Sequence, residues 1–144
     1  EGRLHFGLPA GVEGRLTVWV SALPCWQCGV ETQALTEVVL TAGTHLHSFS
    51  VPDFEGYPHL LAVVCSALPT ASRVGQLKPR FSRTQGRAYL SNGCVRCDAL
   101  IGEYFFGGLI ADQEPVGVVA ITLARDWLDF IEAHDGHEQR WGVF

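Results

Sequence analysis

Two Cys-x-x-Cys pairs, far apart in the chain, constrain the fold more than any other feature of this sequence. The first pair is Cys25 and Cys28, and the second pair is Cys94 and Cys97. The two-residue spacing lets both thiolates of a pair reach one ion, and zinc favours four thiolates in a closed tetrahedral site. We therefore predict that the two pairs meet around one zinc ion and bring distant parts of the chain together.

Two other interpretations of these four cysteines stay open at this point. Two disulfides would require an oxidising compartment, and a rubredoxin-like iron site also uses two such pairs. Zinc is favoured because each pair accounts for the other, and nothing else in the sequence indicates an oxidising compartment. Four thiolates leave no open position for water, so the predicted zinc is structural and not catalytic. The fifth cysteine, Cys65, lies in an apolar run and is expected to be a small buried residue.

The residues around the first pair predict a hairpin that carries it. Residues 15–20 are β-branched and partly alternating, which indicates a strand that leads into the first pair. Residues 35–41 indicate the strand that leaves it, and residues 44–49 a further short strand.

The middle of the chain is expected to be less regular. Residues 52–58 predict a loop, and Pro58 suits the first turn of a buried helix that continues to Leu68. Residues 72–86 have weak periodicity and several breakers, which indicates a loop with irregular strand. Residues 87–90 predict a strand that leads into the second pair.

The last third of the chain predicts one strand and one helix. Residues 116–123 are almost all apolar, which is typical of a strand buried on both faces. Residues 125–134 form an amphipathic pattern, with Trp127 and Phe130 on the apolar side and Gly136 as the C-terminal cap.

Together these elements predict an α+β fold in a single domain. A discontinuous zinc ribbon, formed by residues 15–41 and 87–106, is built into a mostly antiparallel sheet with two or three helices. Residues 42–86 are an insertion between its halves, and residues 116–134 supply the C-terminal strand and helix. A chain of 144 residues is long enough to bury a core of its own.

The composition predicts a globular protein, and the first residues together with the cysteine usage favour the cytoplasm. Hydrophobic residues make up 47% of the chain and charged residues 17%, which excludes a disordered chain. The longest apolar runs are about half of the ~20 residues that a membrane span needs, so we expect no membrane partner. The first residues lack the basic and apolar segments of a signal peptide.

Positive charge is concentrated in one part of the chain. Between Gly56 and Cys97 there is no Asp or Glu, although the formal net charge of the chain is −5. That stretch holds a candidate anion site, whose residues are Lys78, Arg80, Arg83 and Arg87. Phe81 and Tyr89 could stack on nucleic-acid bases. The alternative interpretation is that these cations form ion pairs with acidic residues in the rest of the chain.

The expected partner is therefore an unidentified protein first and a nucleic acid second. The sequence pI near 5.6 argues against general nucleic-acid binding, which usually requires a strongly basic domain. The resulting hypothesis is a binding or scaffold module with a structural zinc.

A hydrolase-type enzyme with a second, histidine-based metal site is the third hypothesis. His45 and His47 would share one face of a strand, with Asp53 or Glu55 as a third ligand. Surface or hydrogen-bonded histidines explain this pattern more simply. The other candidate groups are His59 and the cluster from His134 to Glu138. The chain has no nucleophile elbow, phosphate-binding glycine loop or dinucleotide fingerprint, so we assign no catalytic or cofactor-binding residue besides the zinc ligands.

The stretch from Lys78 to Phe105 resembles a group of uncharacterised bacterial zinc-ribbon proteins. In that group a segment similar to R-Y-S-x-T-x-G-x-x-Y-x-x-N-x-C-x-x-C-x-A-x-x-G-x-x-F follows an earlier Cys-x-x-Cys pair. The resemblance covers about thirty residues and the first pair. It implies a split zinc site shared by both pairs, and it implies no activity.

Overall fold

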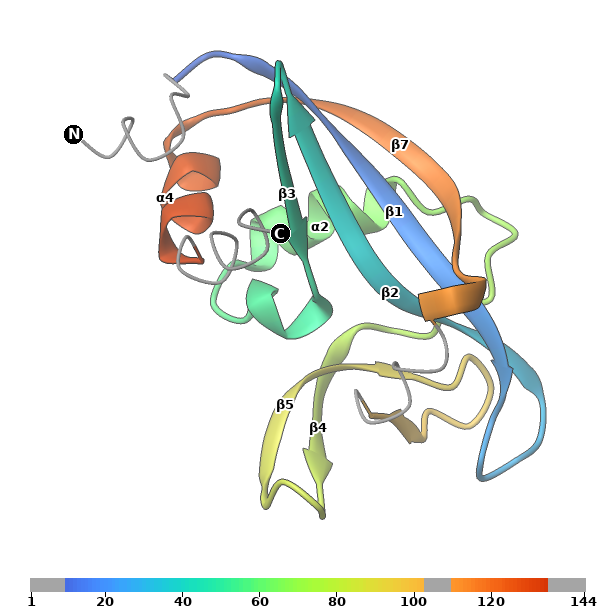
Figure 1. The fold of residues 1–144 in the computed structure, drawn as a ribbon. Coiled ribbons are helices and arrows are strands. Elements are labelled where there is room, and N and C mark those ends of the chain that lie inside the picture. The colour runs from blue at the N-terminus through green and yellow to red at the C-terminus, as the bar shows by residue number, and fades with distance from the viewer. Residues whose placement is uncertain (1–9, 103–109, 135–144) are drawn as a thin grey trace.

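A long antiparallel hairpin organises the fold (Figure 1). It consists of β1 (Glu13–Pro24) and β2 (Glu31–Ala42), and the first cysteine pair lies in the turn that joins them. The computed structural model describes residues 10–102 and 110–134. Both strands extend beyond the segments predicted from the sequence, so the hairpin runs from the core to the first cysteine pair.

The inner part of this hairpin belongs to a four-stranded antiparallel sheet. The strand order is β3-β2-β1-β7, where β3 is His45–Phe49 and β7 is Glu114–Thr122. Side chains alternate between the two faces of a strand, so Leu16 and Val18 of β1 point into the core and are fully buried. The sequence prediction of a short strand at 44–49 is confirmed.

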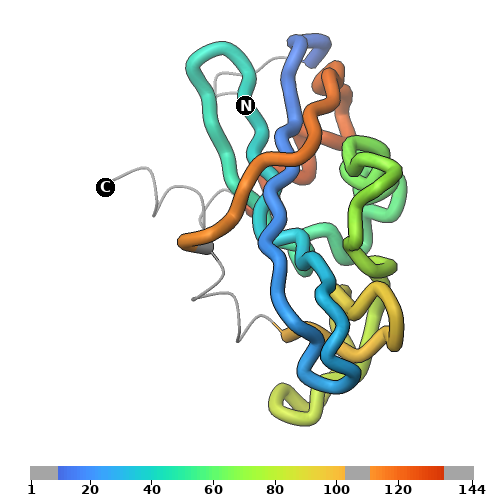
Figure 2. The backbone as a smooth tube through the Cα atoms, turned by 90° about the vertical axis from the view of Figure 1, so that its right-hand side faces the viewer, coloured from blue at the N-terminus to red at the C-terminus, as the bar shows by residue number. Residues whose placement is uncertain are grey.

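Two helices cover one face of this sheet, as the turned view in Figure 2 shows. They are α2 (Pro58–Ser66) and α4 (Arg125–Ala133), and a 3-10 helix, η1 (Val51–Phe54), precedes α2. Phe130 of α4 lies at the centre of the core, with its ring 4.6 Å from that of Phe54. The amphipathic helix predicted at 125–134 is confirmed, whereas Gly136 lies outside the described residues.

Three sequence predictions about this layer are wrong. β7 is an edge strand with Val118 exposed and only Ile121 buried, because the helices cover a single face of the sheet. Cys65 is exposed, since α2 turns only the side with Leu60 and Val64 to the core. The predicted loop at 52–58 begins as η1, where Asp53 accepts the backbone N–H of Ser50.

A second, smaller antiparallel sheet carries the second cysteine pair. Its strands are β4 (Lys78–Ser82), β5 (Arg87–Gly93) and β6 (Leu100–Ile101), in that order. The irregular segment predicted within 72–86 thus contains a regular strand, which pairs with β5 in an unbroken register. A short 3-10 helix, η3 (Ile110–Asp112), precedes β7. The fold is therefore α+β and dominated by two antiparallel sheets, as predicted.

Asn92 joins the two sheets through the core. Its side-chain amide donates to the carbonyl of Leu35 in β2 at 3.0 Å and accepts the N–H of the same residue at 2.8 Å. Asn92 is 1% exposed and Leu35 is fully buried, so the two hydrogen bonds satisfy polar groups that water does not reach. This contact fixes β5 against β2 and thereby the second cysteine pair against the first hairpin.

No helix within the described ranges has the length and apolar character that a bilayer crossing requires.

Candidate metal centre

The first cysteine pair lies in a tight turn at the end of β1, here named the first knuckle (residues 25–29). The N–H of Gly29 donates to the carbonyl of Cys25 at 2.9 Å, which closes the turn. The N–H groups of Gln27 and Cys28 point at the Cys25 sulfur, at 3.3 and 3.5 Å. Gly29 has a φ of +80°, a left-handed conformation that glycine adopts without strain.

The second knuckle (residues 94–98), between β5 and β6, repeats this geometry. The N–H of Asp98 donates to the carbonyl of Cys94 at 3.0 Å. The N–H groups of Arg96 and Cys97 point at the Cys94 sulfur, at 3.3 and 3.5 Å. Asp98 is left-handed as well, with a φ of +67°. The two turns therefore present their thiols in the same way.

The four sulfur atoms converge on a single point between the knuckles. All four lie within 4.8 Å of one another, with Cys25 and Cys97 sulfurs 3.6 Å apart and Cys28 and Cys94 sulfurs 3.7 Å apart. In a tetrahedral site with Zn–S bonds of about 2.3 Å, neighbouring sulfurs lie ~3.8 Å apart. None of the four cysteines forms a disulfide. They are positioned to bind one metal ion.

The electrostatics of this cluster also suit a cation. Burial raises the pKa of the Cys94 thiol, but hydrogen bonds from the N–H groups of Cys97 and Arg96 and from the Cys25 and Cys28 thiols together lower the pKa to about 6. For Cys97, the N–H of Ala99 lowers the pKa, yet burial and the neighbouring cysteine sulfurs raise it to about 12. Four thiolates repel one another at such distances, so a divalent cation is what allows all of them to ionise.

Further contacts hold the knuckles against each other. The hydroxyl of Thr32 in β2 accepts the N–H of Val95 at 3.0 Å and donates to the carbonyl of Arg73. The indole N–H of Trp26 donates to the carbonyl of Leu100 at 2.7 Å. The contacts of Thr32 with Val95 and of Trp26 with Leu100 join the first knuckle and its hairpin to the other half of the site.

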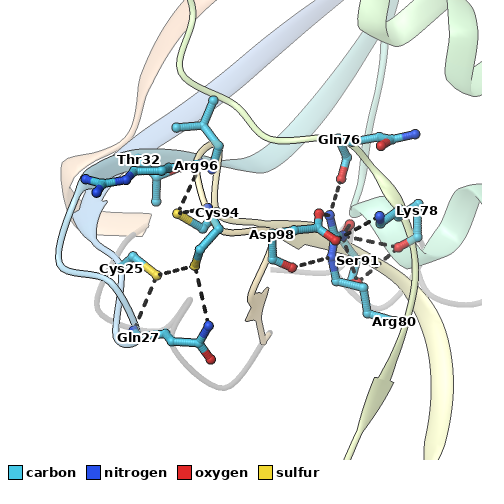
Figure 3. A network of polar contacts seen from close by, with 12 residues as sticks. Cys25, Gln27, Thr32, Gln76, Lys78, Arg80, Ser91, Cys94, Arg96 and Asp98 are labelled. Carbon is cyan, nitrogen blue, oxygen red and sulfur yellow. Dashed lines mark hydrogen bonds and ion pairs between the residues drawn. The ribbon is translucent and has the colours of Figure 1, made fainter.

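A buried arginine supports the second knuckle from behind (Figure 3). The side chain of Arg80 is only 7% exposed, and its guanidinium pairs with the Asp98 carboxylate at 2.5 Å. It also donates to the backbone carbonyls of Gln76, Ser91 and Asp98, at 2.7, 2.8 and 3.1 Å. Gly93 makes room for this group, because a Cβ there would lie 2.2 Å from a guanidinium nitrogen.

Lys78 completes this support and affects the acidity of Asp98. Its ammonium lies 2.8 Å from the Asp98 carboxylate. Hydrogen bonds from Lys78 first and Arg80 second lower the pKa of Asp98. The carboxylate is therefore ionised at neutral pH and held by two cations.

The four candidate anion-binding residues thus lie in two different settings. Lys78 and Arg80 face inward to Asp98, as the alternative of internal pairing predicts for them. Arg83 and Arg87 are exposed and form no ion pair with another described residue. The Arg87 guanidinium lies 5.5 Å from the centre of the Tyr89 ring. Anion binding itself stays a prediction, and only Arg83 and Arg87 are placed to perform it.

The histidine hypothesis gains no third ligand in the described part of the chain. His45 and His47 do share one face of β3, with parallel rings 6.4 Å apart. Asp53, however, caps η1 and lies 3.6 Å from His134, and Glu55 accepts the N–H of Leu90. Among described residues, the four cysteines are the one group of three or more such ligands that could hold a metal.

The remaining histidines have structural positions where they are described. His59 pairs with Asp126 at 2.9 Å, which joins α2 to α4. The ring of His134 lies at the end of α4, 2.8 Å from the carbonyl of Phe130. Residues 135–138 of the predicted cluster lie outside the described residues.

The supporting roles of Asp98, Asn92 and Thr32 around the cysteines were not predicted from the sequence. Asp98 occupies the position that Gly29 has in the first knuckle, and aspartate tolerates the left-handed conformation better than most residues. The equivalent positions of Gly29 and Asp98, each directly after the second cysteine of its pair, are the sequence signal for this left-handed residue. Asn92 and Thr32 carry no local signal, because their partners lie far away in the chain.

No family model, curated protein or solved structure matches this chain. What the site can do therefore follows from its own geometry.

Proposed function

We propose that this protein is a zinc-stabilised binding module in which one zinc ion, held by Cys25, Cys28, Cys94 and Cys97, has a structural role. The single observation that carries this proposal is the convergence of four sulfurs at the spacing of a tetrahedral thiolate site. Zinc is favoured over iron because it is the usual ion of closed four-cysteine sites that join two knuckles.

The position of the site explains what the ion does. It joins the turn of the β1–β2 hairpin to the β5–β6 turn, which are more than sixty residues apart in the chain. Since four protein ligands fill the tetrahedron, no position is left for substrate. The free energy of metal binding becomes folding free energy, because the unfolded chain does not hold the four sulfurs together.

We also propose that the resemblance to uncharacterised bacterial split zinc-ribbon proteins reflects the same structural zinc site. Several residues of the shared pattern have structural roles in this chain. Arg80 and Asn92 are buried and hydrogen-bonded, and Tyr89 is buried beneath Arg87. Gly86 has a φ of +69° in the β4–β5 turn. The pattern is thus suited to specify the scaffold of the second knuckle rather than a reaction.

Metal analysis of the purified protein tests this proposal. We expect one zinc per chain, no visible absorbance from iron, and a large loss of thermal stability when a strong chelator removes the ion. A chain without bound metal, or a melting temperature that chelation leaves unchanged, would overturn the structural role. Thiol counting under native conditions then separates bound from oxidised cysteines, because two disulfides would survive chelation.

A further inference from the structure

A groove of about 760 Å³ opens beside the metal centre. It is formed by three segments: the first knuckle with Trp26, the β4–β5 turn with Phe81 and Arg83, and the chain after the second knuckle with Leu100. Because the metal joins the first and third of these segments, the groove exists only when the two knuckles are held together. Nothing in the proposed structural role of the zinc requires such a groove.

Two large aromatic side chains are exposed at this groove. Phe81 is 64% exposed and Trp26 is 62% exposed, the highest values for large apolar residues in the described part of the chain. The hydrogen bond from Trp26 to the carbonyl of Leu100 fixes the indole in place. A ring held in this way loses little conformational freedom when a flat ligand stacks on it. Exposed apolar surface gathered in one concave place indicates a binding site.

Among the described residues, the charge at the groove is positive. None of its described lining residues is acidic. Asp98, the carboxylate of the second knuckle, is paired with Lys78 and Arg80. Arg83 lines the groove and is exposed, and Arg87 covers the Tyr89 ring that also lines it. A ligand that fits must therefore combine flat apolar faces with negative charge.

We propose that this groove binds single-stranded nucleic acid, with unpaired bases stacked on Trp26 and Phe81 and phosphates near Arg83 and Arg87. This proposal rests on the binding module proposed above and names its partner. Stacking on aromatic side chains together with arginine contacts to the backbone is how proteins hold single strands without reading sequence. A duplex hides its base faces, and an acidic peptide offers charge without flat faces. No acidic residue in the described part of the chain lines this groove, so the net charge of −5 does not by itself exclude local binding.

The two knuckles supply a matched pair of variants for the test. Trp26 and Val95 occupy equivalent positions, each directly after the first cysteine of its knuckle, and both are exposed. Only Trp26 lines the groove. The experiment measures fluorescence anisotropy of labelled oligo(dT), oligo(rU) and a duplex of equal length with the zinc-loaded full chain at low salt.

We expect the parent protein to bind both single strands more tightly than the duplex. Trp26→Ala should weaken binding about tenfold, since one stacked base is lost, whereas Val95→Ala should leave it unchanged and Trp26→Phe should retain most of it. Removing Arg83 or Arg87 should reduce the salt slope of log affinity by about 0.7 each. The comparison of oligo(dT) with oligo(rU) shows which sugar the groove accepts.

Three results would overturn this proposal: no binding of single strands by the parent protein, equal binding of the duplex, or equal losses for Trp26→Ala and Val95→Ala. Zinc content and melting temperature are measured on every variant, so these results are read on folded protein. If zinc is present and stabilising but single strands do not bind, the nucleic-acid partner alone is wrong. If zinc is absent, the proposed structural role fails on separate grounds.

Discussion

Each knuckle presents two sulfur atoms to the metal in the same geometry, but the two knuckles are supported in different ways. Each turn aims two backbone N–H groups at the sulfur of its first cysteine, at matching distances of 3.3 and 3.5 Å. Each ends on a left-handed residue, Gly29 in the first knuckle and Asp98 in the second. The first knuckle relies on the backbone freedom of glycine. The second relies on an aspartate side chain that two cations hold in place.

This difference shows that the same metal-binding turn can be specified by its own backbone or by contacts with side chains from elsewhere in the chain. A left-handed conformation costs an ordinary residue roughly 1–2 kcal/mol, and glycine avoids that cost. Asp98 accepts part of it and gains contacts with Lys78 and Arg80, which also order the β4–β5 hairpin. The left-handed turn of the first knuckle therefore depends on its own sequence, whereas that of the second is also positioned by a neighbouring strand.

Removing a thiolate from either knuckle is expected to have the largest effect. The loss of zinc and of stability should be the same for both knuckles. Cys28→Ser and Cys94→Ser should each release zinc and destabilise the fold by several kcal/mol, on the order of half of the total stability of a small domain. Thermal melting and metal analysis of the two variants measure this. Cys65→Ser is the control and should change neither quantity, because Cys65 is exposed on α2, outside the four-cysteine cluster. If only one of the two knuckle variants lost zinc, the shared site would be wrong.

Replacing the Arg80 guanidinium should weaken the second knuckle directly and the first knuckle only through the metal that they share. Arg80→Met leaves the carbonyls of Gln76 and Ser91 without their guanidinium donors, at a cost of about 2–4 kcal/mol. The loosened knuckle should also release zinc to a chromogenic chelator faster than the parent protein does. Arg83→Met, an exposed residue next to the same strand, is the matched control. Equal stability of the two variants would show that the buried network is not what positions the second knuckle.

How far the sequence could predict this molecule depends on the range of the interaction concerned. The hairpin strands and α4 were predictable, because alternation and helical periodicity are local patterns. The four metal ligands were predictable because two pairs with the same spacing account for each other. The buried role of Arg80 was not predictable: it depends on the space at Gly93 and on the pairing of β4 with β5.

The same limit explains the wrong predictions. Apolar composition indicated that β7 is buried on both faces, but composition does not say whether a strand lies at the edge of a sheet. Cys65 shares an apolar run with Val64, yet neighbours in a helix point about 100° apart, so only one of them reaches the core. Residues 72–86 were expected to be irregular because they contain several breakers, of which Pro79 is one. Pro79 nevertheless lies within β4, because an edge strand tolerates a residue that has no backbone N–H to donate.

Substituting the two left-handed residues, Gly29 and Asp98, should distinguish support by the local backbone from support by distant side chains. The expected changes in stability are smaller than those above. Gly29→Ala should cost about 1 kcal/mol. Nothing lies within 4 Å of the added Cβ, so this cost comes from the backbone conformation. Asp98→Gly should cost less, because relief of the backbone offsets part of the lost ion pairs. Chemical denaturation of the zinc-loaded variants measures both values. A larger loss for Asp98→Gly would mean that the carboxylate contributes more than the backbone conformation.

Asp98→Asn is expected to change stability least of these substitutions. It separates the charge of Asp98 from its backbone conformation. Asparagine tolerates the left-handed conformation, so this change removes the charge and keeps the backbone. Because the Asp98 side chain is half exposed, the expected loss is only about 0.5–1 kcal/mol and should shrink at high salt. The lowered pKa of Asp98 means that its stabilisation is present above the unfolded pKa and is lost as the pH falls through the folded pKa. Acid also protonates the thiolates and releases the metal, so the substitution at neutral pH separates the two effects. A salt-independent loss of several kcal/mol would assign Asp98 a role in holding the metal turn itself.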